Sequence, residues 1–553
     1  MLGKAFDKLL HEDEEEIHKS IRKVNKQVKK EAEPTPFNIT GFLWGLGVFL
    51  FALATRLIYL YKFQDPHVVG IDWYGDVYHH WQVAIFTRDV GFHEGFLRLW
   101  DLKGLEYYWG LLHPLSLITG FSLLGTTDII VPRLVGSFFS AAAITMLFLI
   151  IKRHFNILSA LAAVVLAALM PVNLFSDTLG MQEPLGLFLL LSGIYFWPKH
   201  AFWTGAFWMM AGMVRSEYWL FGLGMTGAVL LRGRNSQKKL FLGLGYGLFL
   251  LFYMKYMLDY TGNPIYPIYY NFAATVRGDW FIKDIELSTK VQFLQSAFKI
   301  LAVFVITSGL AILWKRPKGY LLYLVGLSNI AFLSYVFGFG SYLYGYPEDG
   351  LTYIIDRNFV DRLMSWPYMF IGALLSIVLL YYVPKVLPKK LKMAGTVFGL
   401  LALAGALGIT QLAWPSIEFH YDKAMGPVAG QMAFGKKLAD YYDGGAIIKP
   451  AGKPAITYSM IQNGIPTKEI ISQQYDPFFY YGEDAANADE GDPFLNWDEF
   501  REEIHDWFEK EDAKMFVIDG EKVETYNRMV ELEPEWFTLL EESSTYKIYE
   551  ITI

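Results

Sequence analysis

The sequence predicts an α-helical membrane protein of about eleven spans that carries a smaller α/β domain at its C-terminal end. Three observations support this prediction. The 553 residues are 53% hydrophobic, with a mean hydropathy of +0.27, and the apolar runs approach the ~20 residues that a helix needs to cross a bilayer. Short basic loops alternate with longer acidic loops between these runs. After Trp414 the composition becomes that of an acidic soluble domain.

The N-terminal segment 1–36 is highly charged and lacks the apolar core of a signal peptide. Met1–Glu33 contains eight Lys or Arg residues, and Glu12–Glu16 is an acidic run. We expect a cytoplasmic, helical surface segment here. A solvated tail without a specific function is the other interpretation.

The topology follows from the positions of the basic loops. Cytoplasmic loops of membrane proteins collect Lys and Arg, and threading the chain through its apolar runs places these basic loops on one side. The N-terminus is then inside the cell and the C-terminal domain outside. Counting Tyr107–Leu124 as a twelfth span would reverse every later loop, so we predict a re-entrant or interfacial helix there, within the first outer loop. The candidate spans are 39–61, 128–151, 157–175, 183–198, 201–215, 217–231, 240–258, 294–314, 319–340, 363–383 and 393–413.

The domain organisation is therefore a cytoplasmic segment 1–36, a transmembrane domain 37–413 and an extracytoplasmic α/β domain 414–553. The last domain has 28 Asp or Glu residues against 12 Lys or Arg residues. An amphipathic helix is expected at Trp497–Glu511. Alternating apolar residues predict strands at Ala455–Ser459, Met515–Asp519 and Tyr546–Thr552.

Composition excludes several classes of function. The chain has no cysteine, which excludes disulfides, thiolate nucleophiles, zinc–thiolate sites and iron–sulfur clusters. A net charge of -7 argues against nucleic acid as the main partner.

The first outer loop carries the first candidate catalytic residues, Asp72 and Asp76. Asp76 can cap a helix that runs from Val77 to about Val90 and ends at Gly91. The apolar face of this helix has the spacing of a helix lying on a membrane surface; its residues are Val77, Trp81, Ala84 and Ile85. A carboxylate at the helix start can accept a proton from a sugar hydroxyl or hold a divalent metal. The plainer interpretation is a capping residue and a turn residue.

Four histidines lie in the same loop: His79, His80, His93 and His113. His79 and His80 are adjacent and point to different helix faces, so packing or hydrogen bonding is favoured over metal ligation. His113 precedes Pro114 at the start of the re-entrant segment and can place an imidazole near Asp76.

The second outer loop contributes Asp177 and Glu183, with Pro184 in a first-turn position of the next helix. Both acids are candidate substrate-binding residues, and helix capping is the alternative role. Arg215 and Glu217 follow at the outer end of the fifth span. Ionisable groups at membrane depth are costly, so Arg215 is a candidate phosphate ligand, with contact to lipid headgroups as the alternative.

A third candidate group precedes the tenth span. Asp356-Arg357 and Asp361-Arg362 lie just before Trp366-Pro367. Arginine binds phosphate through a planar fork of N–H donors, so Arg357 and Arg362 are candidate substrate-binding residues. Two surface ion pairs of little energetic consequence are the alternative.

These motifs together resemble the polyprenyl-phosphate-dependent membrane glycosyltransferases of the GT-C class, in particular protein O-mannosyltransferases and aminoarabinose transferases. The matching features are the acidic motif Asp72–Asp76, the His113-Pro114 element and the Gly-x-x-Asp-x-x-x-x-Arg stretch Gly125–Arg133. By architecture the resemblance covers residues 37–413. The Asp-Glu pair usual in the O-mannosyltransferases is absent, because Val77 follows Asp76.

Oligosaccharyltransferases share the GT-C fold class and resemble this chain less. Their Trp-Trp-Asp acceptor motif is missing, because Trp100-Asp101 and Trp497-Asp498 are single Trp-Asp pairs.

The resemblance implies an inverting, hexosyltransferase-type enzyme of the cell envelope in the plasma membrane. A sugar on a polyprenyl monophosphate would be the donor, and a glycan, lipid or protein the acceptor. Asp76 or Asp72 would act as general base, and Arg215, Arg357 or Arg362 would stabilise the departing phosphate. Such chemistry does not require a metal, so a divalent ion is not favoured. A lipid-glycan transporter or flippase and a non-catalytic assembly scaffold are the rival interpretations.

Overall fold

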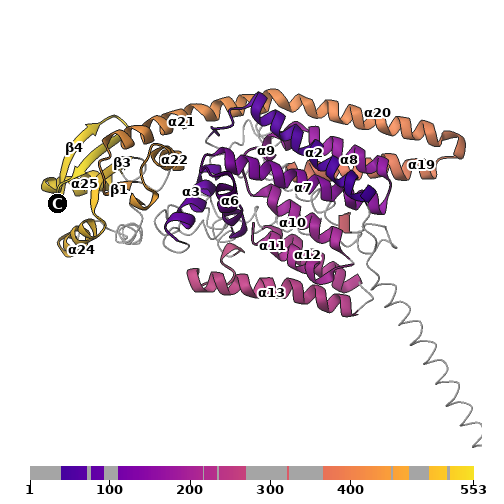
Figure 1. The fold of residues 1–553 in the computed structure, drawn as a ribbon, viewed down its shortest axis with the longest axis horizontal. Helices are drawn as coiled ribbons and strands as arrows, with labels where there is room; N and C mark the ends of the chain where they lie inside the picture. The colour runs from indigo at the N-terminus through magenta and orange to yellow at the C-terminus, as the bar shows by residue number, and fades with distance from the viewer. Residues whose placement is uncertain are drawn as a thin grey trace, which may run out of the picture. The chain divides into compact units, whose positions relative to one another are not determined.

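The computed structural model describes residues 39–70, 76–91, 110–197, 199–215, 217–232, 236–268, 321–322, 365–449, 453–472, 497–519 and 523–553. The described residues from Val48 onward form one compact unit. The described part of the membrane region is helical, and a sheet follows near the C-terminus (Figure 1).

Five helices among the described residues are long and apolar enough to cross a membrane. They confirm helices at five of the predicted spans. Each has an uninterrupted apolar run that buries its backbone polar groups in its own hydrogen bonds, as a bilayer requires. Three are the single helices α2 (Ile39–Phe63), α7 (Ile130–His154) and α13 (Ser236–Thr261). The fourth is the run Ser365–Val386, made of α18 (Ser365–Ile377), η2 (Val378–Tyr382) and α19 (Val383–Val386), and the fifth is α20 (Lys392–Thr410) with its extensions.

The predicted span 157–175 is a broken helix. α8 (Ile157–Leu169) and α9 (Pro171–Asp177) meet at an angle of 65°. Met170 between them is extended, with φ -64° and ψ 127°, because a residue that precedes proline is pushed out of the helical region. Counted as one span, this pair raises the number of candidate spans in the described chain to six.

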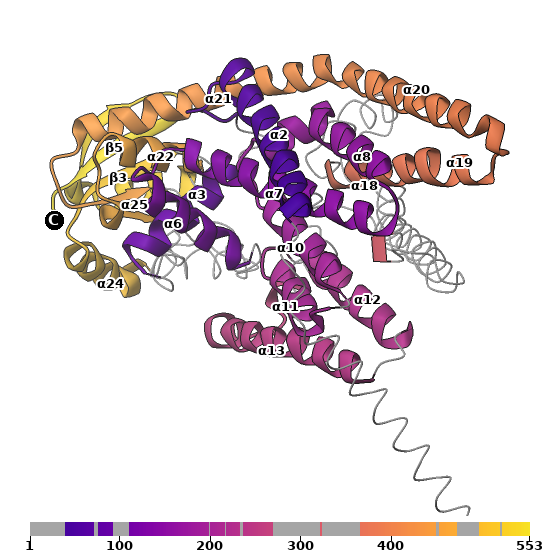
Figure 2. The ribbon, with the colours of Figure 1, turned by 45° about the vertical axis from the view of Figure 1, so that its right-hand side comes forward.

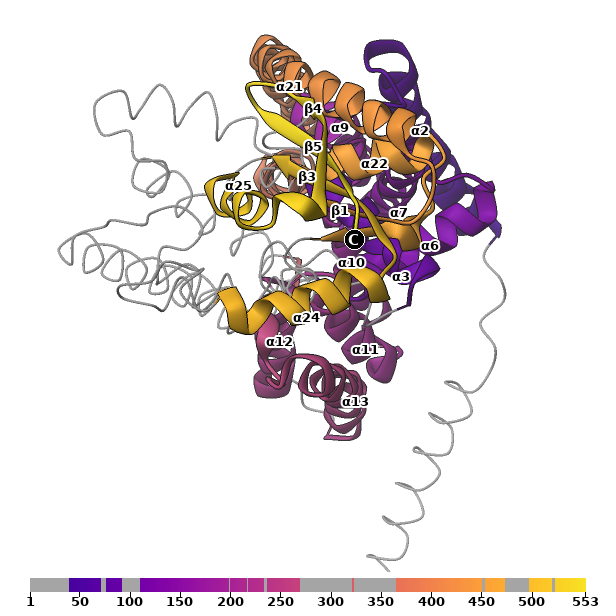
Figure 3. The same ribbon diagram turned by 90° about the vertical axis from the view of Figure 1, so that its left-hand side faces the viewer.

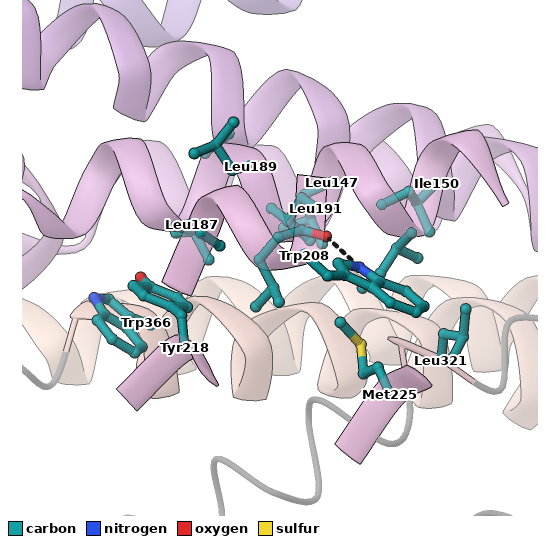
Figure 4. Close-up of a cluster of buried hydrophobic side chains, with 14 of the residues drawn as sticks. Leu147, Ile150, Leu187, Leu189, Leu191, Trp208, Tyr218, Met225, Leu321 and Trp366 are labelled. Atoms are coloured by element: carbon teal, nitrogen blue, oxygen red, sulfur yellow. Dashed lines mark hydrogen bonds between the residues drawn. The ribbon is translucent and has the colours of Figure 1, made fainter. Parts of the chain in front are cut away.

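Three further predicted spans are shorter helices: α10 (Glu183–Phe196), α11 (Ala201–Gly212) and α12 (Glu217–Arg232), of 14, 12 and 16 residues. Each falls below the ~20 residues of a typical span. They pack closely, and the indole of Trp208 on α11 donates a hydrogen bond to the Leu190 carbonyl of α10 at 3.3 Å (Figure 4). The predicted spans 294–314 and 319–340 lie outside the described residues except for 321–322.

The segment between α2 and α7, predicted as the first outer loop, contains α3 (Asp76–Asp89) and α6 (Leu112–Leu124). Helix α3 has the predicted extent, and Gly91 follows it with φ +122°. Helix α6 has 13 residues, about 20 Å at 1.5 Å per residue, which is too short to cross a bilayer. The predicted exposure of one face of α3 to a membrane surface is wrong. Its four apolar side chains are buried inside the protein because α3 packs between other elements; they are Val77, Trp81, Ala84 and Ile85.

The C-terminal region begins with α21 (Trp414–Tyr441), which continues from α20 through the short turn η4 (Gln411–Ala413). A five-stranded mixed sheet follows, in the order β2-β1-β3-β5-β4. β1 pairs in parallel with β2 and β3, and β5 pairs antiparallel with β3 and β4. The strands are β1 (Ala446–Lys449), β2 (Ile470–Ser472), β3 (Ala513–Asp519), β4 (Phe537–Glu542) and β5 (Tyr546–Ile551).

β3 and β5 confirm two of the three predicted strands, and α24 (Trp497–Lys510) confirms the predicted amphipathic helix. The third predicted strand, Ala455–Ser459, is wrong. These residues lie in helix α22 (Pro454–Gln462), with Pro454 in its first turn. Proline is pre-organised for that position, and a short apolar run does not by itself distinguish a buried helix from a strand.

Helices cover both faces of the sheet. Phe516 and Ile518 of β3 face α24 and α25 (Val523–Leu532) in one core, whereas Met515 and Val517 belong to the core that includes α21 and α22. This alternation is the period-two pattern of a strand. The second core also contains α3, α6 and the start of α7, so this face of the sheet shares its core with the first outer loop (Figure 3).

Candidate functional site

The loop between α9 and α10 is the centre around which the predicted site residues gather. Gly180 in this loop has φ +93°, and a Cβ placed there would lie within 3.0 Å of Pro132 on α7 and of Val77 on α3. Gly136 of α7 admits the same loop, because its Cβ would lie 3.1 Å from the Asp177 carbonyl oxygen. Glycine is required where backbones approach this closely. The start of α3, with Asp76, therefore lies against the loop between Asp177 and Glu183.

Asp177 ends α9 and forms a buried ion pair. Arg56 of α2 donates to its Oδ2 at 2.7 Å, and the Ser140 hydroxyl of α7 donates to the same oxygen at 2.5 Å. Arg56 Nε donates to the Ser140 hydroxyl at 3.1 Å, and its terminal nitrogens also donate to the carbonyls of Ala167 and Ala168, each at 3.1 Å. These carbonyls lose helical partners at the break before Pro171. The guanidinium thus donates hydrogen bonds to the last carbonyls of α8 and places a positive charge beside the Asp177 carboxylate.

Glu183 begins α10 and forms the second buried pair, with Arg215 in the turn between α11 and α12. Their side chains are 5% and 11% exposed, so little water screens them. Tyr218 donates to the Glu183 carbonyl at 3.2 Å, and its ring stacks on Trp366 with centroids 4.8 Å apart (Figure 4). Arg215 therefore has a carboxylate partner from another helix, as the charge cost of burial requires.

Of the two catalytic candidates, the structure describes only Asp76. Asp76 lies in the first turn of α3 with a partly exposed side chain, where the positive end of the helix dipole favours an anion. Asp72 lies outside the described residues, as do Arg357 and Arg362. Their predicted roles stay predictions.

His113 is buried in α6 and its ring contacts the ring of His80 edge to face, with centroids 4.8 Å apart. His80 is four residues after Asp76 on α3, so both lie on one face of that helix. Burial lowers the pKa of His113 to about 3, and the Gly180 backbone opposes this shift by less. The imidazole is therefore neutral near pH 7. The predicted preference for packing over metal ligation stays a prediction.

The Gly125–Arg133 stretch acts as a clamp on the chain that leads into the acidic motif. Gly125 ends α6 in the left-handed conformation at φ +66°. Asp128 accepts from the Ile130 amide at 2.7 Å and contacts the His67 ring at 3.0 Å. Arg133 is fully buried and donates to the backbone carbonyls of Val68 and Thr178, both at 2.9 Å, and to Asp65 and Gln64.

Arg133 thus joins two loops that are far apart in the sequence. Residues 64–68 lie immediately before the acidic motif, and Thr178 lies beside Asp177. One guanidinium with five N–H donors can serve both segments because its donors point in several directions. Gly125, Asp128 and Arg133 of the Gly-x-x-Asp-x-x-x-x-Arg stretch therefore each have a structural role in this chain.

Sequence reasoning missed Arg56, Ser140 and the partners of Arg133. Arg56 carries a signal that could have identified it, because an arginine inside an apolar span is unfavourable unless it is paired. Ser140 carries no such signal, since serine is common in apolar helices. The partners of Arg133 are mostly backbone carbonyls, which every residue possesses.

An apolar groove of about 400 Å³ opens beside the break between α8 and α9. Met170, Pro171 and Val172 line one wall, and Tyr368 and Ile409 line the opposite walls from α18 and α20. Val172 is five residues before Asp177, about 7.5 Å along a helix. The α9 wall of the groove therefore leads toward Asp177.

Among the described residues, His505, Asp506 and Glu509 of α24 form a group with metal-ligand spacing. The group is partly to fully exposed and belongs to the C-terminal domain rather than to the cluster around Gly180. The expectation that the reaction needs no metal stays a prediction.

The chain matches no protein-family model and no curated protein. Among solved structures it is similar to ArnT from Cupriavidus metallidurans bound to undecaprenyl phosphate, with 13% identity over 93% of this chain and 97% of that chain, at a TM-score of 0.43. It is also similar to the oligosaccharyltransferase of Archaeoglobus fulgidus in its apo form, with 12% identity over 90% of this chain and 73% of that chain, at a TM-score of 0.44.

A third similar structure is AglB from the same archaeon in complex with an inhibitory peptide and a dolichol-phosphate, with 13% identity, 92% and 74% coverage and a TM-score of 0.39. ArnT is an aminoarabinose transferase, a class that the sequence motifs resemble, and the oligosaccharyltransferases belong to the GT-C class that these motifs resemble less. At identities of 12–13% and TM-scores of 0.39–0.44, these likenesses carry no argument about activity.

Proposed function

We propose that this chain is a membrane glycosyltransferase that moves a sugar from a polyprenyl-phosphate donor to an acceptor at the outer face of the membrane. The observation that carries this proposal is the close contact at Gly180 between α3 and the loop that leads into α10. Two helix N-termini attract anions through their dipoles and free N–H groups. Asp76 lies at the start of α3, Asp177 and Glu183 flank the loop, and Arg215 joins them through its ion pair with Glu183.

The chemistry needs a base and a site for a leaving anion. A carboxylate, Asp76 or Asp72, takes the proton from the acceptor hydroxyl as its oxygen attacks the anomeric carbon. The bond from that carbon to the phosphate oxygen breaks, and the electron pair leaves with the lipid phosphate. Attack opposite to the leaving group inverts the anomeric centre. Arginine donors stabilise the developing phosphate charge.

The apolar groove suits a lipid-borne donor. Its lining is mainly apolar, with Tyr368, Thr410 and Ser416 as its polar members, and its α9 wall leads toward Asp177. A polyprenyl chain already lies among lipid tails that are as apolar as the groove, so the groove would fix the position of the chain rather than remove it from water. The phosphate at the head of such a lipid would lie toward the cluster around Gly180.

Purified protein in lipid nanodiscs tests the proposal with radiolabelled glycosyl-phosphoryl polyprenols and an envelope-glycan acceptor. We expect Asp76→Asn to abolish transfer and to leave folding intact, because the amide keeps the helix cap and loses the basic oxygen. Asp259→Asn is the matched control, since Asp259 pairs on the surface with Lys255. Near-normal turnover of Asp76→Asn would move the role of base to Asp72, and inactivity of the wild type with every donor would refute the proposal.

Arg362 is the proposed main donor to the leaving phosphate, with Arg357 and Arg215 as the other candidates. Arg362→Ala is expected to reduce transition-state stabilisation by about 2–4 kcal/mol, the magnitude of other lost oxyanion donors. Arg362→Lys should raise the apparent donor requirement because lysine lacks the planar fork. Unchanged kcat and KM in Arg362→Ala would assign this arginine to an ion pair instead.

A transporter or flippase is the second candidate, and the broken helix α8–α9 with its buried Arg56–Asp177 pair favours it. Transporters place such features near the bilayer midplane. Arg56 is five residues beyond the middle of the 25-residue α2, about 7.5 Å toward its C-terminal end. Movement of labelled lipid without sugar transfer in proteoliposomes would select this candidate.

A further inference from the structure

Helix α3 is held between two elements that come from distant parts of the sequence. α6 packs on it from the first outer loop, and α22 packs on it from the C-terminal region (Figures 1 and 2). Ten of the 14 residues of α3 are buried as a result. The helix that carries Asp76 therefore depends on α22 for part of its packing.

Tyr458 of α22 makes the central contacts. Its ring meets Tyr78 edge to face with centroids 5.5 Å apart, and it meets Trp81 in the same way at 4.9 Å. Its hydroxyl accepts a hydrogen bond from the Ile129 amide at 3.3 Å, immediately before α7. Aromatic pairs of this geometry contribute beyond their buried area. Tyr458 thus contacts α3 and the clamp segment together.

Polar contacts extend this interface to both sides of Tyr458. Gln462 at the end of α22 donates to the Thr127 hydroxyl at 3.1 Å. Thr467, in the turn after α22, donates to Asp89 at the end of α3 at 2.8 Å. The contact therefore spans most of the length of α3.

Helix α22 is itself fixed within the C-terminal region. Ser459 donates to the Met432 carbonyl of α21 at 2.6 Å. Gly435 of α21 allows the close approach, since a Cβ there would lie 2.5 Å from the Ile456 carbonyl oxygen. A rigidly held α22 can transmit the position of the sheet to α3.

We propose that the C-terminal α/β domain positions α3, and with it Asp76, through Tyr458. This inference rests on the proposed function, because it assigns the domain to the transfer reaction. Tyr458 is a positioning residue: it touches α3 one turn after Asp76 and does not touch the reacting atoms. A displacement of about 1 Å in a reacting group can lower a rate about 100-fold, so loss of this contact acts on kcat.

The test compares three variants of the full chain in nanodiscs. Tyr458→Ala removes both ring contacts, and Tyr458→Phe keeps them while removing the hydroxyl. Tyr526→Ala is the matched control, because Tyr526 is also 6% exposed and packs on Phe516 in the core that faces away from α3. We expect kcat to fall about 100-fold in Tyr458→Ala with the donor KM changed less than about threefold. Tyr458→Phe should stay within about fivefold of the wild type, and Tyr526→Ala should keep its kcat while it loses thermal stability.

Hydrogen exchange read by mass spectrometry is the second measurement, and it does not depend on activity. Amides of α3 should exchange faster in Tyr458→Ala than in the wild type or Tyr526→Ala. Wild-type kcat in Tyr458→Ala, equal losses of kcat in both alanine variants, or unchanged exchange in α3 would each overturn the inference. Wild-type protein that transfers no sugar would refute the proposed function alone, because the exchange comparison would still show whether α22 positions α3.

Discussion

Breaking the Arg56–Asp177 pair should cost far more than removing both charges together. Arg56→Met leaves Asp177 buried with one hydroxyl donor, Ser140, and leaves two carbonyls of α8 without the guanidinium. Asp177→Asn leaves Arg56 with those carbonyls but without a counter-charge. Removal of one partner of a buried pair typically costs about 3–5 kcal/mol because an uncompensated charge remains.

The double variant has no uncompensated charge. If the two single costs were additive, their sum would be about 6–10 kcal/mol. Instead we expect the double variant to be no less stable than the worse single variant, which gives a coupling of at least about 3 kcal/mol. Arg56→Met should be the worse single variant, because Arg56 satisfies backbone carbonyls as well as Asp177.

Unfolding of the four proteins in matched detergent micelles measures these differences, with helix content followed by circular dichroism as denaturant increases. Lys255→Met/Asp259→Asn provides the control cycle for an exposed pair, where the coupling should stay below about 1 kcal/mol. Additive effects at Arg56 and Asp177 would show that the pair does not stabilise the junction of α8 and α9, and the account of the broken helix would be wrong.

Three further predictions concern pH, packing and topology. The pKa of His113 is lowered from 6.5 to about 3, so the stability from its neutral ring is present above pH 6.5 and is lost as the pH falls. One pKa unit corresponds to about 1.4 kcal/mol, so the free energy of unfolding at pH 5 should be about 2 kcal/mol lower than at neutral pH. This loss should be absent in His113→Gln; the same dependence of stability on pH in both proteins would contradict the lowered pKa of His113. Gly180→Ala should lower the free energy of unfolding by at least about 1–2 kcal/mol, because Gly180 has a positive φ and a Cβ there would contact Pro132. Gly224 has open space around it, so Gly224→Ala should not destabilise the protein. Protease added to intact spheroplasts should cleave residues 414–553, and protection there with cleavage in inverted vesicles would reverse the topology.

Much of the helical architecture could be predicted from the sequence because it is encoded locally. An apolar run of 20 or more residues forms a span whatever its neighbours are, so α2, α7 and α13 lie where hydropathy places them. The ends of α3 are equally local, since Asp76 and Gly91 are residues that start and stop helices. The helix/strand error at Ala455–Ser459 occurs where the local signal is weak, because five apolar or small residues fit either structure.

The sequence by itself determined which residues carry charge and where they stand along the membrane helices, but their partners depended on the tertiary structure. Asp177 and Glu183 are conspicuous in a short outer loop, yet Asp177 pairs with Arg56, 121 residues away. Arg133 is recognisable in a motif, yet it donates mainly to backbone carbonyls, which leave no trace in the sequence. The face of α3 predicted for a membrane surface is covered by α6 and α22 instead, because apolar side chains show only that they avoid water and not what covers them. Which elements cover this face is decided only when the chain folds and brings α6 and α22 to α3.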